Sequence, residues 1–215
     1  MTDWIDASLF EDDDGKVYFV WQNGRIARMN EEMTDLAEKP RLLKPSNHKQ
    51  VGFEGAYVTK KDGKYYILTG NLLVLNKYGR KPDAPDNMKG DRLYLLESQG
   101  LDNWKYKGVF YERNPKWTED SEDNMCPSFL PLPRTPDGGQ PSGKHLLLFI
   151  SHNKGCQYYV GDYDTKNDRF LPDNHGRMSW VDNTYFAPEA LVDGKGRQIM
   201  WAWLTDNPSG EAERG

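Results

Sequence analysis

Residues 5–21 read IDASLFEDDDGKVYFVW, and residues 53–68 repeat the same pattern as FEGAYVTKKDGKYYIL. Each stretch holds an apolar, strand-like segment, a turn in which a glycine precedes a lysine, and a second segment rich in aromatic and β-branched residues. Such segments on either side of a glycine-containing turn are typical of a β-hairpin. The two stretches therefore predict the same hairpin twice, with Gly15 and Gly63 in the turns.

A weaker form of this pattern recurs twice further along the chain. The third copy joins residues 126–132 to 145–150 through a Pro/Gly-rich insertion and Gly143, and the fourth joins 185–192 to 198–203 through Gly196. Additional strand candidates lie between the hairpins, at residues 25–29, 93–98, 106–111, 157–163 and 169–170. Each unit therefore contains about four short strands, and we expect them to pair in antiparallel order.

Four-stranded units repeated at intervals of about 50 residues are typical of a β-propeller. A β-sandwich is the alternative, but it gives no reason for the same hairpin to recur at a fixed interval. Amphipathic helical periodicity over ten or more residues is absent, so we expect little helix. Residues 1–215 are thus expected to form a single all-β domain of about four blades. Because the chain starts and stops close to blade strands, we expect this propeller to be partial.

The composition favours a globular protein and excludes several classes of partner. The 215 residues carry 28 basic and 33 acidic side chains, and 13% of them are aromatic, enough to build a core. The basic residues form no stripe, which argues against nucleic acid, and no apolar run approaches the roughly 20 residues that span a membrane. Residues 1–6 show no secretory signal, so we expect a cytoplasmic protein. We expect Cys126 and Cys156 to be buried thiols, and we expect neither a metal nor a cofactor.

Two carboxylates are the leading candidates for catalysis. Asp6 lies nine residues before Gly15, and Glu54 lies nine residues before Gly63. Because the first strand of each blade lines the central channel, equivalent positions converge on the axis. A pair of carboxyl groups can cleave a glycosidic bond, one as general acid and the other as nucleophile, base or charge stabiliser. Three aromatic residues are expected to stack on a sugar there: Trp4, Trp21 and Phe53.

Other polar and aromatic residues rank lower. Asp182 and Glu189 lie near the fourth inner strand and are candidates for binding sugar hydroxyls, although capping of a strand end is an equally good interpretation. Trp201 and Trp203 alternate along one strand, and we expect them to pack inside a blade. The acidic run at residues 11–14 is expected to be solvated, and its order does not fit an EF-hand loop.

The first half of the chain resembles glycoside hydrolase family 43. Residues 5–18 are similar to that family's second-blade motif, and residues 54–57 with 60–66 are similar to its third-blade motif. The resemblance implies a five-bladed propeller in which Asp6 orients the acid and tunes its pKa, while Glu54 is the general acid. It also implies that the general base is an Asp on a preceding blade.

The second half resembles glycoside hydrolase family 32, the β-fructosidases and invertases, which share the five-bladed propeller. The similar segments are residues 93–98, 103–106, 126–132, 158–163, 185–189 and 199–203. In this register the resemblance implies that Asp6 is the nucleophile and that Glu54 occupies the place of the transition-state stabiliser. The two families thus assign different roles to one pair, and they differ in stereochemistry, since family 43 inverts and family 32 retains.

One position departs from the family 32 pattern. Met125 stands where that family carries its acid/base Glu, and a thioether cannot donate a proton. Glu122 and Asp123 are the nearest carboxyl groups in the sequence, and Asp123 is a further candidate for binding substrate. We predict an O-glycosyl hydrolase that acts on oligosaccharides or polysaccharides built from furanosides, pentosides or β-fructosides. The alternatives are a carbohydrate-binding propeller with impaired catalysis and a truncated glycosidase.

Overall fold

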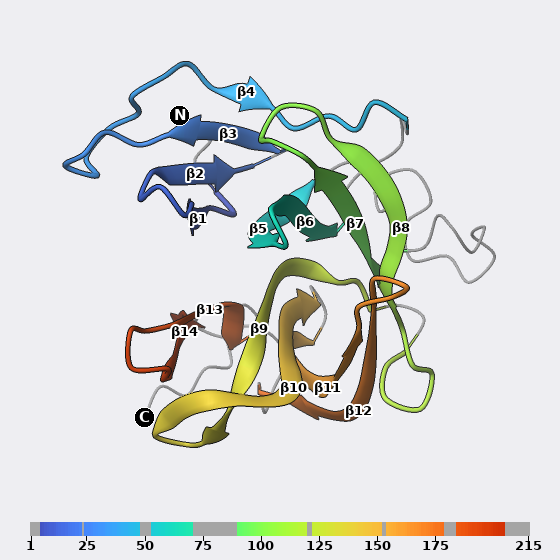
Figure 1. Cartoon of the computed structure of the whole chain (residues 1–215). Helices are drawn as coiled ribbons and strands as arrows, with labels where there is room; N and C mark the ends of the chain where they lie inside the picture. Colours follow the sequence, from blue (N-terminus) through green and yellow to red (C-terminus); the bar gives the residue numbers. More distant parts are fainter. Residues whose placement is uncertain are drawn as a thin grey trace.

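The computed structural model describes residues 5–22, 24–47, 53–70, 90–119, 122–151, 154–178 and 184–204, which form antiparallel sheets and no helix (Figure 1). The first sheet contains β1 (Ser8–Glu11), β2 (Val17–Trp21), β3 (Arg25–Arg28) and β4 (Arg41–Leu42). The second contains β5 (Glu54–Lys61), β6 (Lys64–Gly70), β7 (Arg92–Ser98) and β8 (Lys105–Glu112). The third contains β9 (Met125–Thr135), β10 (Gly138–Ser151), β11 (Gly155–Asp164) and β12 (Arg169–Arg177). The fourth pairs β13 (Tyr185–Val192) with β14 (Gln198–Leu204).

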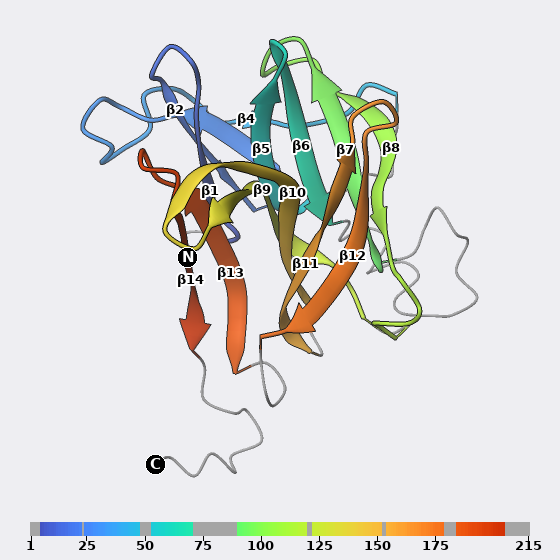
Figure 2. The ribbon, with the colours of Figure 1, turned by 60° about the horizontal axis from the view of Figure 1, so that its bottom comes forward.

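The sheets are arranged as propeller blades. Within each sheet the strands pair in chain order, and the first strands contact one another from blade to blade, β1 with β5, β5 with β9, and β9 with β13 (Figure 2). These four are the inner strands. The predicted all-β propeller of about four blades is confirmed, and no segment in the described ranges forms a helix that could cross a membrane.

The third hairpin differs from its prediction. Residues 133–144 do not form a loop but extend β9 and β10, and the turn lies at Pro136 and Asp137 rather than at Gly143. The pairing register of β10 with β9 shifts on both sides of Pro141. Proline is tolerated at such β-bulges because the missing N–H breaks no ladder hydrogen bond there. The Pro/Gly-rich composition therefore marks a bulged hairpin.

A residue in the left-handed region of backbone space lies near the start of each inner strand. These four residues, here called the left-handed positions, are Asp6 (φ 54°), Gly55 (φ 63°), Cys126 (φ 49°) and Ala187 (φ 50°). In β5, β9 and β13 the pairing register shifts across the same residues, which identifies a β-bulge. Bulges bend a strand and change the direction of its side chains. The same bend therefore recurs at one end of the blades.

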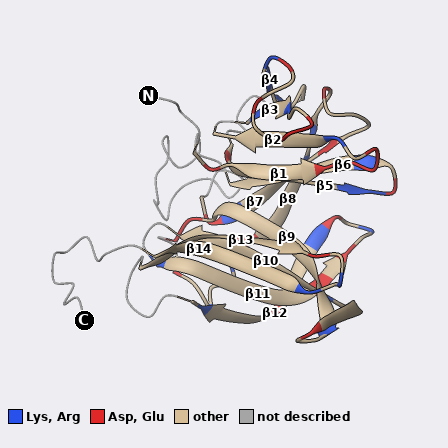
Figure 3. Ribbon diagram, turned by 90° about the vertical axis from the view of Figure 1, so that its left-hand side faces the viewer, with Lys and Arg blue, Asp and Glu red and all other residues tan. Residues whose placement is uncertain are grey.

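Apolar cores fill the spaces between neighbouring blades. The first core joins Phe10 and Val20 of the first sheet to Phe53 and Trp104, which directly precede β5 and β8 of the second. The second core lies between the second and third sheets, and a third lies beside β13. Figure 3 shows that the charged residues concentrate near the turns, while most of the strands are neither acidic nor basic. Burial between blades thus holds the inner strands in fixed relation.

Two surface predictions need correction. Asp12, from the acidic run at 11–14, is not simply solvated: it binds Lys60 Nζ at 2.5 Å and Tyr65 Oη at 2.6 Å across the first two blades. Burial alone would raise the pKa of Asp12, but these contacts lower it below its usual value. Trp201 and Trp203 are 50% and 65% exposed rather than packed in a blade. Within the described ranges β14 pairs only with β13.

Candidate functional site

Three carboxyl groups from three blades face the start of β9. The Cys126 thiol lies there, 93% buried, with its Sγ 3.7 Å from Oδ1 of Asp6. Burial raises the pKa of this thiol, and the charges of Asp6, Glu54 and Glu189 raise it further. Asp6 precedes β1, Glu54 begins β5, and Glu189 lies on β13. The structure therefore brings the predicted pair Asp6 and Glu54 into one site and adds Glu189.

Asp6 and Glu54 do not occupy equivalent backbone positions, although each lies nine residues before a turn glycine. Asp6 is a left-handed position, and its counterpart in the second blade is Gly55. The equal spacing arises because the first hairpin has a longer turn, residues 12–16, than the second, residues 62–63. The two side chains therefore reach the site from different points on their strands.

Close packing fixes the backbone around Glu54. Its N–H donates to Thr69 Oγ1 at 3.1 Å, and the residue pairs with Gly70 on β6. A Cβ on Gly70 would lie 2.4 Å from the Asn124 carbonyl oxygen and 2.7 Å from Met125 Sδ. Met125 itself is fully buried with Ile150 and Cys156. The thioether at this position therefore packs in an apolar cluster beside Glu54.

Glu189 is half-buried and hydrogen-bonded to the neighbouring blade. Ser128 Oγ donates to Glu189 Oε2 at 3.0 Å, and Ser128 is completely buried. Burial raises the pKa of Glu189 to about 7, while the Ser128 hydroxyl opposes the shift. The Glu189 charge also adds to the burial that raises the pKa of Tyr57 on β5. This carboxyl group is thus protonated well above the pH at which an ordinary Glu ionises.

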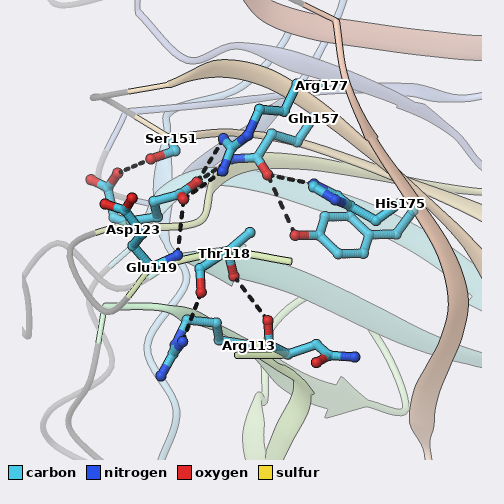
Figure 4. Close-up of polar contacts among 11 residues, drawn as sticks. Arg113, Thr118, Glu119, Asp123, Ser151, Gln157, His175 and Arg177 are labelled. Carbon is cyan, nitrogen blue, oxygen red and sulfur yellow. Dashed lines mark hydrogen bonds and ion pairs between the residues drawn. The ribbon is translucent and has the colours of Figure 1, made fainter. Parts of the chain in front are cut away.

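Glu122 is held as an ionised carboxylate, and Figure 4 shows two of its partners, Arg177 and Gln157. It accepts two hydrogen bonds from Arg177, at 2.8 and 2.6 Å, and one from Gln157 Nε2 at 2.8 Å. Burial would raise the pKa of Glu122, but Arg177, the Glu119 N–H and Gln157 together hold it below its usual value. This carboxylate is therefore committed to a bidentate ion pair. The sequence offered no signal for the pair, because Arg177 ends a strand in another part of the third blade.

Asp123 and the aromatic candidates lie inside the protein. Asp123 is completely buried and accepts a hydrogen bond from Ser151 Oγ at 3.3 Å. Trp21 and Phe53 are also buried, and a Cβ on Gly24 would lie 2.5 Å from the Phe53 ring. Their burial favours a structural role, and contact with a sugar stays a prediction. Trp4 and Asp182 lie outside the described residues.

The carboxyl groups lie apart from an apolar cavity between the second and third blades. A cavity of about 370 Å³ is lined by residues of the second and third blades, including Lys61, Tyr66, Phe129 and Tyr163. Lys61 ends β5, whereas Glu54 begins it, so the cavity and the carboxyl site lie at opposite ends of this strand. Among the residues with described positions, no three His, Cys, Asp or Glu side chains are grouped to hold a metal ion.

The comparisons with known proteins agree with this architecture. Residues 26–214 match the sequence profile of the N-terminal domain of glycosyl hydrolases family 32. A fructan 1-exohydrolase of Leymus chinensis is 35% identical over 138 residues, which are 56% of this chain and 22% of the relative. An insoluble beta-fructofuranosidase of Arabidopsis thaliana is 27% identical over 169 residues, which are 71% of this chain and 25% of the relative. The chain thus spans about a quarter of these relatives.

Two solved structures share the fold. The sucrose-6-phosphate hydrolase of Lactobacillus gasseri superimposes with a TM-score of 0.62 at 18% identity, over 92% of this chain and 40% of that protein. The fructan 1-exohydrolase IIa of Cichorium intybus superimposes with a TM-score of 0.54 at 18% identity, over 94% of this chain and 38% of that protein.

Proposed function

Because this chain belongs to family 32 of the glycosyl hydrolases, we propose that it hydrolyses the O-glycosidic bonds of β-fructosides. The observation that carries the proposal is the gathering of Asp6, Glu54 and Glu189 around the start of β9. Glycosidic cleavage needs two carboxyl groups, one to protonate the leaving oxygen and one to face the anomeric carbon. Such chemistry uses side chains alone and needs no organic cofactor.

We assign Asp6 to the anomeric carbon, as nucleophile or as stabiliser of the cationic transition state. Its left-handed backbone turns it toward Cys126, and the Cys126 thiol, although a weak donor, holds one carboxylate oxygen. Glu54 comes from the neighbouring blade, and we assign it to the stabilisation of the transition state. The separation of two such carboxyl groups decides stereochemistry, with about 5–5.5 Å giving retention and roughly 6.5–9.5 Å inversion.

The names of the relatives favour fructosyl over pentosyl substrates. Both curated relatives carry names that describe fructan or fructofuranoside hydrolysis, and the Lactobacillus structure is named for sucrose 6-phosphate. We therefore rank sucrose and inulin above arabinofuranosides and xylosides.

The test is hydrolysis of a panel that contains sucrose, inulin, nitrophenyl arabinofuranoside and nitrophenyl xyloside. We expect turnover of a fructoside, and we expect Glu54→Gln to lower it by about 10²–10⁴-fold. Glu31→Gln, an exposed carboxyl group in a turn, is the matched control and should retain full activity. Turnover that survives in Glu54→Gln would refute the assignment of Glu54.

A carbohydrate-binding propeller without catalysis is the second candidate, favoured by the burial of Met125 in an apolar cluster. Calorimetric titration with inulin distinguishes the two functions. Binding of inulin by a folded protein that hydrolyses none of the panel would favour the binding protein.

A further inference from the structure

Glu189 occupies a position that recurs in all four blades. It lies two residues after the left-handed position Ala187, just as Ser8, Tyr57 and Ser128 follow Asp6, Gly55 and Cys126. Ser128 donates to Glu189, and the pKa of Tyr57 responds to its charge, so these equivalent residues face one another across blades. Glu189 is the only carboxylic acid among these four equivalent residues, and it lies close to two of the others.

The bulge in β13 directs Glu189 toward β9. The pairing register of β13 with β14 shifts between Phe186 and Glu189, and the intervening Ala187 has a φ of 50°. On β9 the Ser128 hydroxyl donates to Glu189 Oε2 at 3.0 Å. The charges of Glu189 and Asp6 both act on the Cys126 thiol, so the two carboxyl groups approach the start of β9 from different blades.

The surroundings of Glu189 fit a group that gives up a proton. One carboxyl oxygen accepts the Ser128 hydroxyl, which leaves the other to carry the proton. The side chain is only half-buried, so part of it is accessible to solvent. Glu122, by contrast, is tied to Arg177 as a carboxylate. Environments that give neighbouring carboxyl groups different pKa values distinguish a proton-donating acid from the groups that stay ionised.

We infer that Glu189 is the proton donor of this site, an inference that rests on the proposed glycosidase function. The Glu189 proton moves to the glycosidic oxygen as the bond from that oxygen to the anomeric carbon breaks, and the electron pair of the bond stays on the oxygen. Water then supplies a hydroxyl group to the anomeric carbon and returns one proton to Glu189. Asp6 faces the carbon throughout, and Ser128 is a positioning residue that acts through Glu189.

The experiment compares two substrates that carry the same sugar, the one identified by the panel: a disaccharide and an aryl glycoside. An aryl leaving group is stable as an anion and needs little protonation. We expect Glu189→Gln to lower kcat about 10²–10⁴-fold on the disaccharide and less than about tenfold on the aryl glycoside. Glu31→Gln should change neither rate. Equal losses on both substrates, or a leaving-group dependence found only in Glu54→Gln, would overturn the inference.

A second variant separates catalysis from structural damage. Ser128→Ala removes the hydrogen bond that lowers the pKa of Glu189, so the alkaline limb of the pH profile should move to higher pH. An unmoved limb in a folded, active variant contradicts the role of Glu189. If the wild-type protein hydrolyses nothing, the proposed function fails and the inference falls with it. If the wild-type protein is active and Glu189→Gln is unimpaired, the inference alone fails.

Discussion

Replacing Glu189 with Gln should stabilise the protein at alkaline pH and leave it little changed at acidic pH. In the folded state burial raises the pKa of Glu189 from 4.5 to about 7. The folded state therefore keeps a proton that the unfolded state has released, so stability falls as the pH rises from about 4.5 through 7. At about 1.4 kcal/mol per pH unit, the 2.5 units from 4.5 to about 7 correspond to at most about 3.5 kcal/mol. A Gln carbonyl still accepts the Ser128 hydroxyl but cannot ionise.

The assay is urea unfolding followed by tryptophan fluorescence at pH 5 and pH 8. Other titrating groups affect both proteins alike, so the informative quantity is the free energy of unfolding of Glu189→Gln minus that of the wild type. We expect this difference to grow by about 2–3 kcal/mol between the two pH values. Glu31→Gln should give a constant difference. A constant difference for Glu189→Gln would refute the argument that Glu189 ionises in a buried environment.

Three further predictions concern stability and reactivity. Gly55→Ala places a Cβ 2.4 Å from Cys126 Cα and should lower the free energy of unfolding in urea by about 3–5 kcal/mol. Gly63→Ala, in open space at φ 74°, is the control and should lower it by about 1–2 kcal/mol. Equal losses in the two variants would contradict this prediction. Arg177→Ala removes the ionic partner of the buried Glu122 carboxylate and should lower the free energy of unfolding by about 3–5 kcal/mol. Adding Glu122→Gln in a double variant should restore part of this stability. No recovery in the double variant would count against the ion pair. The buried Cys126 thiol, whose pKa is raised, should react with iodoacetamide at pH 8 roughly tenfold or more slowly in the native protein than in urea, and similar rates would show that it is accessible.

The hairpins were predictable because their signals are local. Alternating apolar residues and turn glycines identified β2 at 17–21 and β13 at 185–192 with the bounds that the structure has. The prediction was wrong at residues 133–144, where composition indicated a loop. Proline and glycine normally end strands, and only pairing with a bulged partner shows that they are compatible with a strand here.

The site was predictable in part. The spacing of Asp6 and Glu54 led to two carboxyl groups that the structure brings together, although their backbone positions are not equivalent. The ion pair of Glu122 with Arg177 depends on the folding of the third sheet and leaves no sequence pattern. The positive φ of Cys126 was also beyond prediction, because residues other than glycine rarely adopt this conformation.

The recurring left-handed positions have a consequence for how such a protein can change over time. An Asp, a Gly, a Cys and an Ala occupy the same backbone bend in four blades, so the bend does not depend on one type of side chain. A functional group can therefore be lost from one blade and appear at the equivalent backbone position of another, with no change in the scaffold. Because the blades are related by near-rotational symmetry, relatives of such a protein can keep the same chemical role while a residue on a different blade performs it.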